Sequence, residues 1–205
     1  MSAADQLHRG IVSLGLDLPE GAEAKLLDFL ALLAKWNRTY NLTAIRREDE
    51  MVSHHLLDSL TLAPYLDGVA TLADIGSGGG LPGIPIAIAC PQIAITSVET
   101  VEKKATFQQQ ARIHLGLANF RVHKGRVEQL QGSFDAVTSR AFAELADFAN
   151  LAGHLVKPGG RLLAMKGEFP TEEIARLPAP WRLAASHELH VPALDAKRHL
   201  MVLER

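Results

Sequence analysis

Residues 70–83 read Ala-Thr-Leu-Ala-Asp-Ile-Gly-Ser-Gly-Gly-Gly-Leu-Pro-Gly. An apolar run that ends in Asp74 and Ile75 passes into a segment with five glycines in eight positions. Glycine costs conformational entropy, so such a cluster between a buried strand and an apolar helix indicates a turn that approaches a ligand closely or needs positive φ. The pattern predicts a β-strand, a nucleotide-binding turn and the N-terminus of a helix.

Two glycine spacings are present in this turn. Gly78, Gly80 and Gly83 fit the G-x-G-x-x-G pattern of dinucleotide-binding proteins. Beginning instead at Gly76, the glycines give G-x-G-x-G directly after the strand. This second frame starts where the strand should end, and it leaves Pro85 in the first turn of a helix, where proline is tolerated. Spacing alone leaves both ligand classes open.

Two acidic residues narrow the choice of ligand. Asp74 stands at the carboxyl end of the first strand, where its carboxylate can bind a ligand amine directly or through water. A pyrophosphate would gain nothing from that acid, whereas a cationic amino-acid ligand would. Glu99 ends the next strand, 23 positions after Gly76, and an acid near that offset can accept both ribose hydroxyls of an adenosine. The adenine would then lie near residues 125–128.

The chain is organised as helices followed by alternating strands and helices. Leucines recur at three- and four-residue spacing up to about Asp67, which predicts two to four helices. Strand candidates and helix-length segments then alternate, which predicts a mostly parallel sheet with right-handed crossovers. The strand candidates are 70–75, 93–98, 119–122, 134–139 and 160–165, and the helical segments between them include 101–115 and 142–155. Residues 182–190 and 198–204 predict a C-terminal antiparallel hairpin. We therefore expect an α/β fold with an N-terminal helical segment, 1–68, packed on a Rossmann-like domain, 69–205.

Composition excludes several classes of protein. The chain has 205 residues, 47% of them hydrophobic, with a net charge of -2, so any nucleic-acid surface must be a local patch. Cys90 is the single cysteine, which excludes a disulfide framework, and we interpret it as a small buried hydrophobe. No segment reaches transmembrane length, and residues 1–10 lack the apolar run of a signal peptide. We expect a soluble, cytoplasmic protein without a membrane partner.

Several short motifs carry a resemblance to a known family. They are Lys35-Trp36-Asn37 with Asn41-Leu42-Thr43-Ala44, His55-x-x-Asp58-Ser59, Asp74-Ile75-Gly76-Ser77-Gly78, Leu81-Pro82-Gly83-Ile84-Pro85, Ser139-Arg140-Ala141-Phe142-Ala143, Lys166-Gly167 and Val191-Pro192-Ala193-Leu194-Asp195. With these motifs in this order, the chain resembles the bacterial ribosomal small-subunit RNA methyltransferase G family, formerly called glucose-inhibited division protein B. The similarity covers nearly the whole chain.

The resemblance implies a Rossmann-like class I methyltransferase that uses S-adenosylmethionine. Its implied substrate is N7 of one guanine in 16S ribosomal RNA, free or within the 30S subunit, and we expect a monomer. The family's cofactor contacts fall on Gly76, Leu81, Val127, Glu128 and Arg140. With the residues derived above, the expected cofactor site also includes Asp74, Gly78, Gly80 and Glu99. The chain departs from some relatives at Gly79, where they carry proline, and at Glu99, which stands in place of an aspartate.

The chemistry of such a site needs no general base. Guanine N7 offers a lone pair in the neutral base, so transfer is an in-line displacement that depends on alignment. The chain has no Asn/Asp-Pro-Pro-Tyr/Phe run, and Cys90 is not placed for attack on a pyrimidine. We identify no certain catalytic residue. Arg140, at the end of the fourth strand, is the candidate for positioning the cofactor carboxylate, guanine O6 or an RNA phosphate.

RNA contact also requires cations. The expected set consists of Lys35, Arg38, Arg46, Arg47, Arg126 and Lys166. Trp36 and Tyr40 are interpreted as packing residues. His55 and Asp58, three apart on a helix, are expected to form a capping or packing pair, and no metal site is predicted.

Other functions compete with this one. The N-terminal helices of a methyltransferase acting on a small molecule or a protein would form a lid over a closed pocket. A non-catalytic ribosome-binding module would bind the cofactor without turnover. A dehydrogenase is the weakest alternative.

Overall fold

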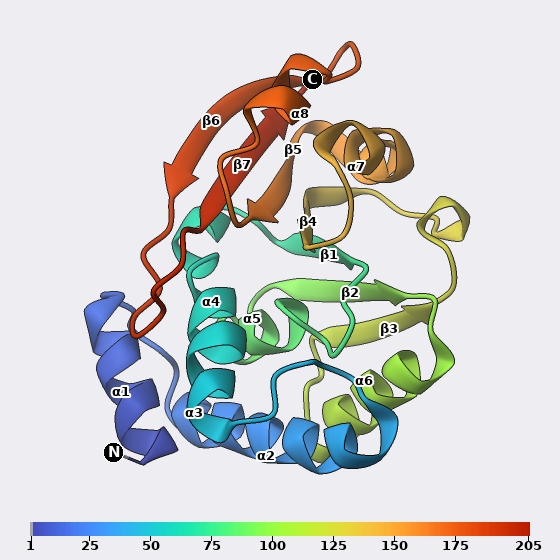
Figure 1. The fold of residues 1–205 in the computed structure, drawn as a ribbon. Coiled ribbons are helices and arrows are strands. Elements are labelled where there is room, and N and C mark those ends of the chain that lie inside the picture. The colour runs from blue at the N-terminus through green and yellow to red at the C-terminus, as the bar shows by residue number, and fades with distance from the viewer. Residues whose placement is uncertain (1) are drawn as a thin grey trace.

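Seven strands form one twisted sheet in the order β3-β2-β1-β4-β5-β7-β6, shown in Figure 1. The computed structural model describes residues 2–205. The strands are β1 (Thr71–Ile75), β2 (Ala94–Glu99), β3 (Phe120–Lys124), β4 (Phe134–Arg140), β5 (Val156–Lys166), β6 (Arg182–Glu188) and β7 (His199–Glu204). Strands β1 to β5 are parallel, whereas β7 pairs antiparallel with both β5 and β6.

Helices lie on both faces of the sheet. The α-helices are α1 (Ala3–Ser13), α2 (Ala22–Tyr40), α3 (Glu48–Met51), α4 (Asp58–Leu60), α5 (Gly83–Ala89), α6 (Glu102–His114), α7 (Leu145–Ala152) and α8 (Thr171–Ala175). A π-helical stretch, η1 (Val52–Leu57), joins α3 to α4, and short 3₁₀ turns are η2 (Ala63–Leu66), η3 (Val127–Gln129) and η4 (Gly153–Leu155). A π-helical stretch is rare and often marks a functional position.

Two apolar clusters hold these layers together. One is continuous from Leu7 and Leu30 of the N-terminal helices to Ile84 of α5 and Phe107 of α6. The other lies on the opposite face, where Phe148 of α7 packs with strand residues. The N-terminal helices therefore cover the α5 and α6 face (Figure 1). The division of the chain at residue 68 stays an interpretation of the sequence.

The sheet has a switch point between β1 and β4. From β1 the chain crosses to β2 on one side, whereas β4 pairs with β1 on the other side. In open α/β sheets, ligands bind at the carboxyl ends of the strands beside such a point. The turn after Ile75 and the turn after Arg140 meet there.

The sequence correctly predicts the mostly parallel sheet, its strands to within a few residues and the C-terminal hairpin. The hairpin joins the sheet through its second strand, β7, which lies between β5 and β6. No helix within residues 2–205 combines the length and apolar character required to cross a bilayer.

Candidate functional site

Two cavities meet at the carboxyl edge of the sheet. The Glu99 cavity, of about 610 Å³, is lined by the ends of β2 and β3, by residues 124–129 and by Phe142. The Arg140 cavity, of about 490 Å³, is lined by residues of the helical segment, the glycine turn and the loops after β4 and β5. Gly76 lines both cavities, so the first glycine of the turn marks their junction.

The glycine turn follows the frame that begins at Gly76. Gly76, Gly78 and Gly80 have φ values of 66°, 56° and 83°, which glycine adopts without the steric cost of a side chain. A Cβ added to Gly78 would find no atom within 4 Å. Gly83 is instead the first residue of α5. The positive φ values thus coincide with the G-x-G-x-G spacing, while Gly83 opens the helix and packs closely against Asp74 of β1.

A buried hydrogen-bond network holds the turn from below. Gln108 of α6 donates through Nε2 to the carbonyl of Gly78 at 2.7 Å and to Oγ of Ser77 at 2.8 Å. Ser97 of β2 donates to the Gln108 carbonyl oxygen and lies 2.5 Å from Ser77 Oγ. Sequence reasoning missed Gln108, although its position midway between the buried Ala105 and Ala111 places it on the core face of α6.

Glu99 is the acid that reaches the cavity at the end of β2. Its two carboxylate oxygens accept hydrogen bonds from the backbone of Gly78 and Val101, each at 2.8 Å. Val127 and Glu128, from the turn after β3, line the same cavity. The structure thus brings these sequence-predicted residues together.

Two residues of the expected cofactor site lie elsewhere. Asp74 is fully buried and lines neither cavity, because Oδ2 accepts the N–H of Gly83 at 2.8 Å beneath the turn. Burial raises the pKa of Asp74 to about 7. Gly80 faces the core, where a Cβ would collide with Ile84. Asp74 therefore does not border an exposed turn, and its contact with a ligand amine stays a prediction.

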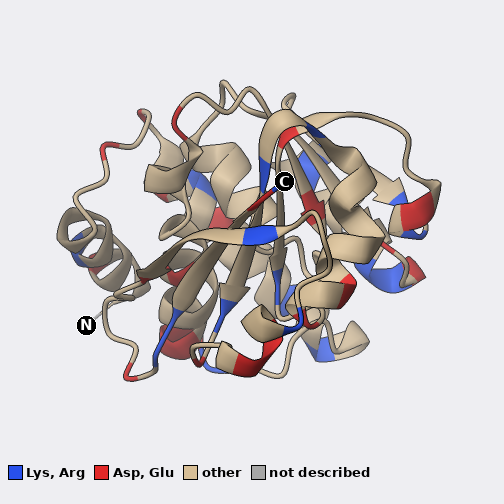
Figure 2. Ribbon diagram, turned by 90° about the horizontal axis from the view of Figure 1, so that it is seen from above, with Lys and Arg blue, Asp and Glu red and all other residues tan. Residues whose placement is uncertain are grey.

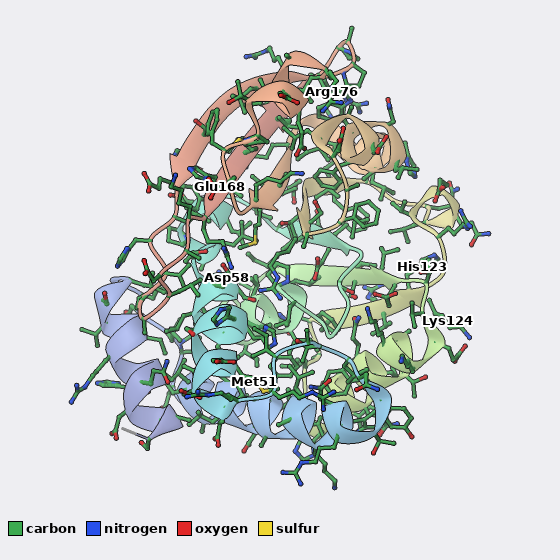
Figure 3. All side chains as sticks on the ribbon, in the orientation of Figure 1. Met51, Asp58, His123, Lys124, Glu168 and Arg176 are labelled. Atoms are coloured by element: carbon green, nitrogen blue, oxygen red, sulfur yellow. The ribbon has the colours of Figure 1, made fainter. Side chains whose placement is uncertain are left out.

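Asp58 organises the Arg140 cavity. Its side chain is 2% exposed, and its oxygens accept from Arg140 Nη1 at 2.7 Å and from Arg198 Nε at 3.0 Å. Arg140 also donates to the carbonyl of His54 at 2.8 Å. Figure 3 shows Asp58 on the helix beside the sheet. This carboxylate therefore ties the helical segment to the end of β4 and to the β6–β7 loop.

The N-terminal motifs form the wall of this cavity. Asn37, 3% exposed, accepts the N–H of Thr43 at 2.9 Å and donates to the carbonyl of Ile45 at 3.2 Å. Thr43 Oγ1 lies 2.9 Å from His55 Nε2. These contacts place residues 42–45 at the cavity.

No hydrogen bond joins His55 to Asp58, although the two side chains lie close enough for the charge of Asp58 to act on His55. His55 bonds to Thr43, and Asp58 bonds to the two arginines. Burial, together with the charge of Arg140, lowers the pKa of His55 to about 4. The imidazole is therefore neutral near pH 7.

The expected RNA-binding cations have different surroundings. Lys166 is engaged, because its ammonium donates to the carbonyl of Ala143 and to Glu173, each at 2.7 Å. Arg47 pairs with Asp49 at 2.7 Å, and Arg46 donates to Asn41 at 2.9 Å. Lys35, Arg38 and Arg126 are exposed. Cationic and acidic positions are interspersed along the ribbon (Figure 2).

Trp36, Tyr40 and Cys90 lie outside the two cavities. Trp36 packs against Phe107 with ring centroids 5.6 Å apart, as expected, and Tyr40, which is 42% exposed, packs against Trp36 with centroids 5.1 Å apart. Cys90 directly follows α5 and is only partly buried. Over the described part of the chain, no group of three or more His, Cys, Asp or Glu is placed to hold a metal ion.

Comparison with known proteins assigns the chain to a family. The family model described as rRNA small subunit methyltransferase G matches residues 22–201. The chain belongs to this family. It is 58% identical to the ribosomal RNA small subunit methyltransferase G of Aromatoleum aromaticum, with 100% of both chains covered, and 52% identical to that of Neisseria meningitidis, again over 100% of each. The chain is therefore an enzyme, a methyltransferase.

A solved structure supports the fold of this methyltransferase. An O-methyltransferase from Bacillus cereus, crystallised with SAH, covers 100% of both chains with a TM-score of 0.63 at 16% identity. At that identity the likeness concerns the fold, and it extends over the N-terminal helices as well as the sheet.

Proposed function

We propose that this methyltransferase transfers the methyl group of S-adenosylmethionine to N7 of a guanine in 16S ribosomal RNA. The observation that carries this proposal is the junction of the two cavities at Gly76. One cavity offers a strand-end carboxylate, Glu99, and the other is lined by arginine, lysine and histidine side chains. When bound, the cofactor supplies an electrophilic methyl group on a sulfonium.

The Glu99 cavity fits the adenosine part of the cofactor. Carboxylate oxygens have lone pairs beyond those used by Gly78 and Val101, and these can accept ribose hydroxyls. Val127 and Glu128 border the space left for the adenine. Gly78 lines the Arg140 cavity beside the junction, and the room beside it supports a close approach of the cofactor to the backbone there. Asp74 supports the turn from beneath and is not proposed as a direct contact.

The Arg140 cavity suits an acceptor that needs no deprotonation. Asp58 is the one carboxylate among the residues that line it, and both of its oxygens accept from arginines. His55 is a weak base, since burial lowers its pKa to about 4. Guanine N7 attacks with its own lone pair, so the chain's residues act by holding and aligning the base, an effect worth roughly 7–11 kcal/mol in favourable cases.

Cations around this cavity support a nucleic-acid substrate. Arg140 and Arg198 each donate to Asp58 through one guanidinium nitrogen. Other N–H groups of the two guanidinium groups can reach guanine O6 or a phosphate. We assign Arg140 to positioning in the cavity and Arg198 to the RNA backbone. The exposed Lys35, Arg38 and Arg126, with Arg46 and Arg47 on the loop before α3, extend this contact. Lys166 braces the loop after β4 instead.

The proposal is tested with labelled S-adenosylmethionine offered to 30S subunits, naked 16S RNA and total metabolites. Label should enter RNA, and chemical cleavage should map one N7-methylguanosine that is present in cells with this protein and absent without it. Label confined to a protein or a metabolite would overturn the proposal. The comparison of 30S subunits with naked RNA identifies the form of the substrate.

A further inference from the structure

Phe142 is an exposed aromatic residue at the junction of the two cavities. Its ring lies against Gly76, so closely that a Cβ on that glycine would be 2.3 Å from Cδ2 of Phe142. The side chain lines the Glu99 cavity, and the residue is 36% exposed. A large apolar side chain at the mouth of a cavity remains partly exposed to solvent. The ring of Phe142 does so at the point where the two cavities meet.

The surrounding loop holds this ring in place. Ala141 has φ 51°, a left-handed conformation that is unfavourable for a residue with a side chain. On one side of the loop Arg140 is bonded to Asp58, and on the other the carbonyl of Ala143 accepts from Lys166 at 2.7 Å. Phe148 of α7 supports the ring edge to face, with centroids 6.4 Å apart at 73°. The loop is therefore braced on both sides of Phe142.

We propose that Phe142 contacts the sulfonium of the bound methyl donor and attracts its positive charge through the aromatic ring. This inference rests on the proposed function. If the adenosine part occupies the Glu99 cavity and the acceptor the Arg140 cavity, the transferred methyl group must lie where they meet, which is at Gly76. The ring on Gly76 then borders the sulfur. Aromatic rings attract cations within about 6 Å of the ring centroid.

This contact distinguishes the substrate form of the cofactor from its product. In methyl transfer the N7 lone pair of guanine would form the new bond to the methyl carbon while the carbon–sulfur bond breaks; that bond's electron pair stays on sulfur, and the positive charge passes to the methylated base. S-adenosylhomocysteine therefore has a neutral thioether in place of the sulfonium. The attraction by Phe142 is present before transfer and lost afterwards, which favours exchange of product for substrate.

Calorimetric titration of the full chain, without RNA, tests the inference. Phe142→Leu should weaken binding of S-adenosylmethionine by roughly 2- to 30-fold, which is the range of a cation–π contact, and should change binding of S-adenosylhomocysteine less than twofold. Phe142→Tyr, which keeps an aromatic ring, should retain the wild-type preference for S-adenosylmethionine over S-adenosylhomocysteine. Phe169→Leu is the matched control, since Phe169 is 44% exposed on the neighbouring loop and lines neither cavity.

The possible results separate the explanations. Equal loss of affinity for both ligands in Phe142→Leu would show that the ring acts by shape, and would overturn the inference. Unchanged affinity for both, with a raised KM for RNA, would assign the ring to the nucleic acid and also overturn it. If the wild-type chain bound neither ligand, the proposed cofactor site itself would be wrong. Thermal unfolding of each variant confirms that it is folded.

Discussion

Arg198 and Asp58 lie 140 residues apart in the chain and are joined by a hydrogen bond of 3.0 Å between Nε and Oδ1. The other oxygen of Asp58 accepts from Arg140 at 2.7 Å. One buried carboxylate thus links the N-terminal helices, the centre of the sheet and the β6–β7 loop. The walls of the Arg140 cavity depend on this cluster of three charged side chains.

Removal of the shared carboxylate should destabilise the fold. Asp58→Ala leaves two largely buried guanidinium groups without their partner, and loss of one member of a buried ion pair costs about 3 kcal/mol. The free energy of unfolding in urea measures the change. Asp49→Ala, which breaks a solvent-exposed pair with Arg47, is the control and should not shift the midpoint. An equal effect of both variants would contradict the role assigned to Asp58.

Arg198→Ala should weaken RNA binding more than cofactor binding. One charge-assisted contact is lost, so the affinity for 16S RNA should fall about tenfold. If the contact is to a phosphate, the slope of log affinity against log salt should also become shallower by about 0.7 to 1. Arg182→Ala, on the outer strand β6, should leave both quantities unchanged. A salt slope equal to that of the wild type would exclude a phosphate contact for Arg198.

Gly78→Ala should abolish or strongly weaken cofactor binding. Gly78 has φ 56°, and its added methyl group would project into open space in the turn. Gly116, at φ 64° after α6, has the same freedom but lines neither cavity. Both substitutions should cost a similar 1–2 kcal/mol of stability because of backbone strain. Calorimetry should detect a change in cofactor affinity for Gly78→Ala alone, and equal cofactor affinities in the two variants would place the ligand elsewhere.

Gln108→Leu should loosen the glycine turn. Leucine fills a similar volume but donates nothing, so the Gly78 carbonyl loses its partner, and Ser77 and Ser97 keep only the bond between their hydroxyls. A buried polar group left unpaired costs about 1–3 kcal/mol. Thermal unfolding and a cofactor titration should both change. Gln110→Leu, exposed on the same helix, provides the comparison and should change neither.

Asp74 should give the protein a distinctive pH dependence. Burial raises its pKa to about 7 from an ordinary value near 3.8, so the folded state binds a proton that the unfolded state has released. The contribution of Asp74 to the free energy of unfolding should therefore fall as pH rises from about 4 to 7 and then level off. Asp74→Asn keeps an acceptor for the Gly83 N–H and should remove this dependence.

The measurement is the difference in unfolding free energy between wild type and Asp74→Asn. It should grow toward about 4 kcal/mol between pH 4 and pH 8, since each unit of pKa corresponds to about 1.4 kcal/mol. The pH dependence of stability that His55 causes has the opposite sign. Its lowered pKa of about 4 favours unfolding as the pH falls below 6.5. Both chains contain His55, so its effect cancels in the difference. Parallel pH profiles would contradict the raised pKa of Asp74.

The strands and the position of the glycine turn were predictable from the sequence. An apolar run that ends in glycine or an acidic residue predicts a strand and locates its carboxyl end to within a few residues. Glu99, Val127 and Glu128 were predictable for the same reason, because parallel strands bring their carboxyl ends to one edge of the sheet. These features depend on local pattern and on a topology that pattern determines.

Local pattern was a poor guide to hydrogen-bond partners. Asp74 stands where a ligand acid would stand, yet the first turn of α5 covers it. His55 and Asp58 are spaced as a helical pair, but η1 and the loops around it supply closer partners. Lys166 appears in sequence as a free cation, whereas Glu173, only seven residues away, turns back on α8 to pair with it.

The sequence by itself determined the fold class, the site of the glycine turn and, through motifs spread over the chain, the family. Tertiary structure alone decided which residues share the Arg140 cavity. Asp58, Arg140 and Arg198 come from three elements whose meeting depends on α4 packing against the sheet and on β7 entering between β5 and β6. Periodicity reports which side of an element is buried, but a contact between distant segments is selected by how whole elements pack, and no short stretch of sequence contains that information.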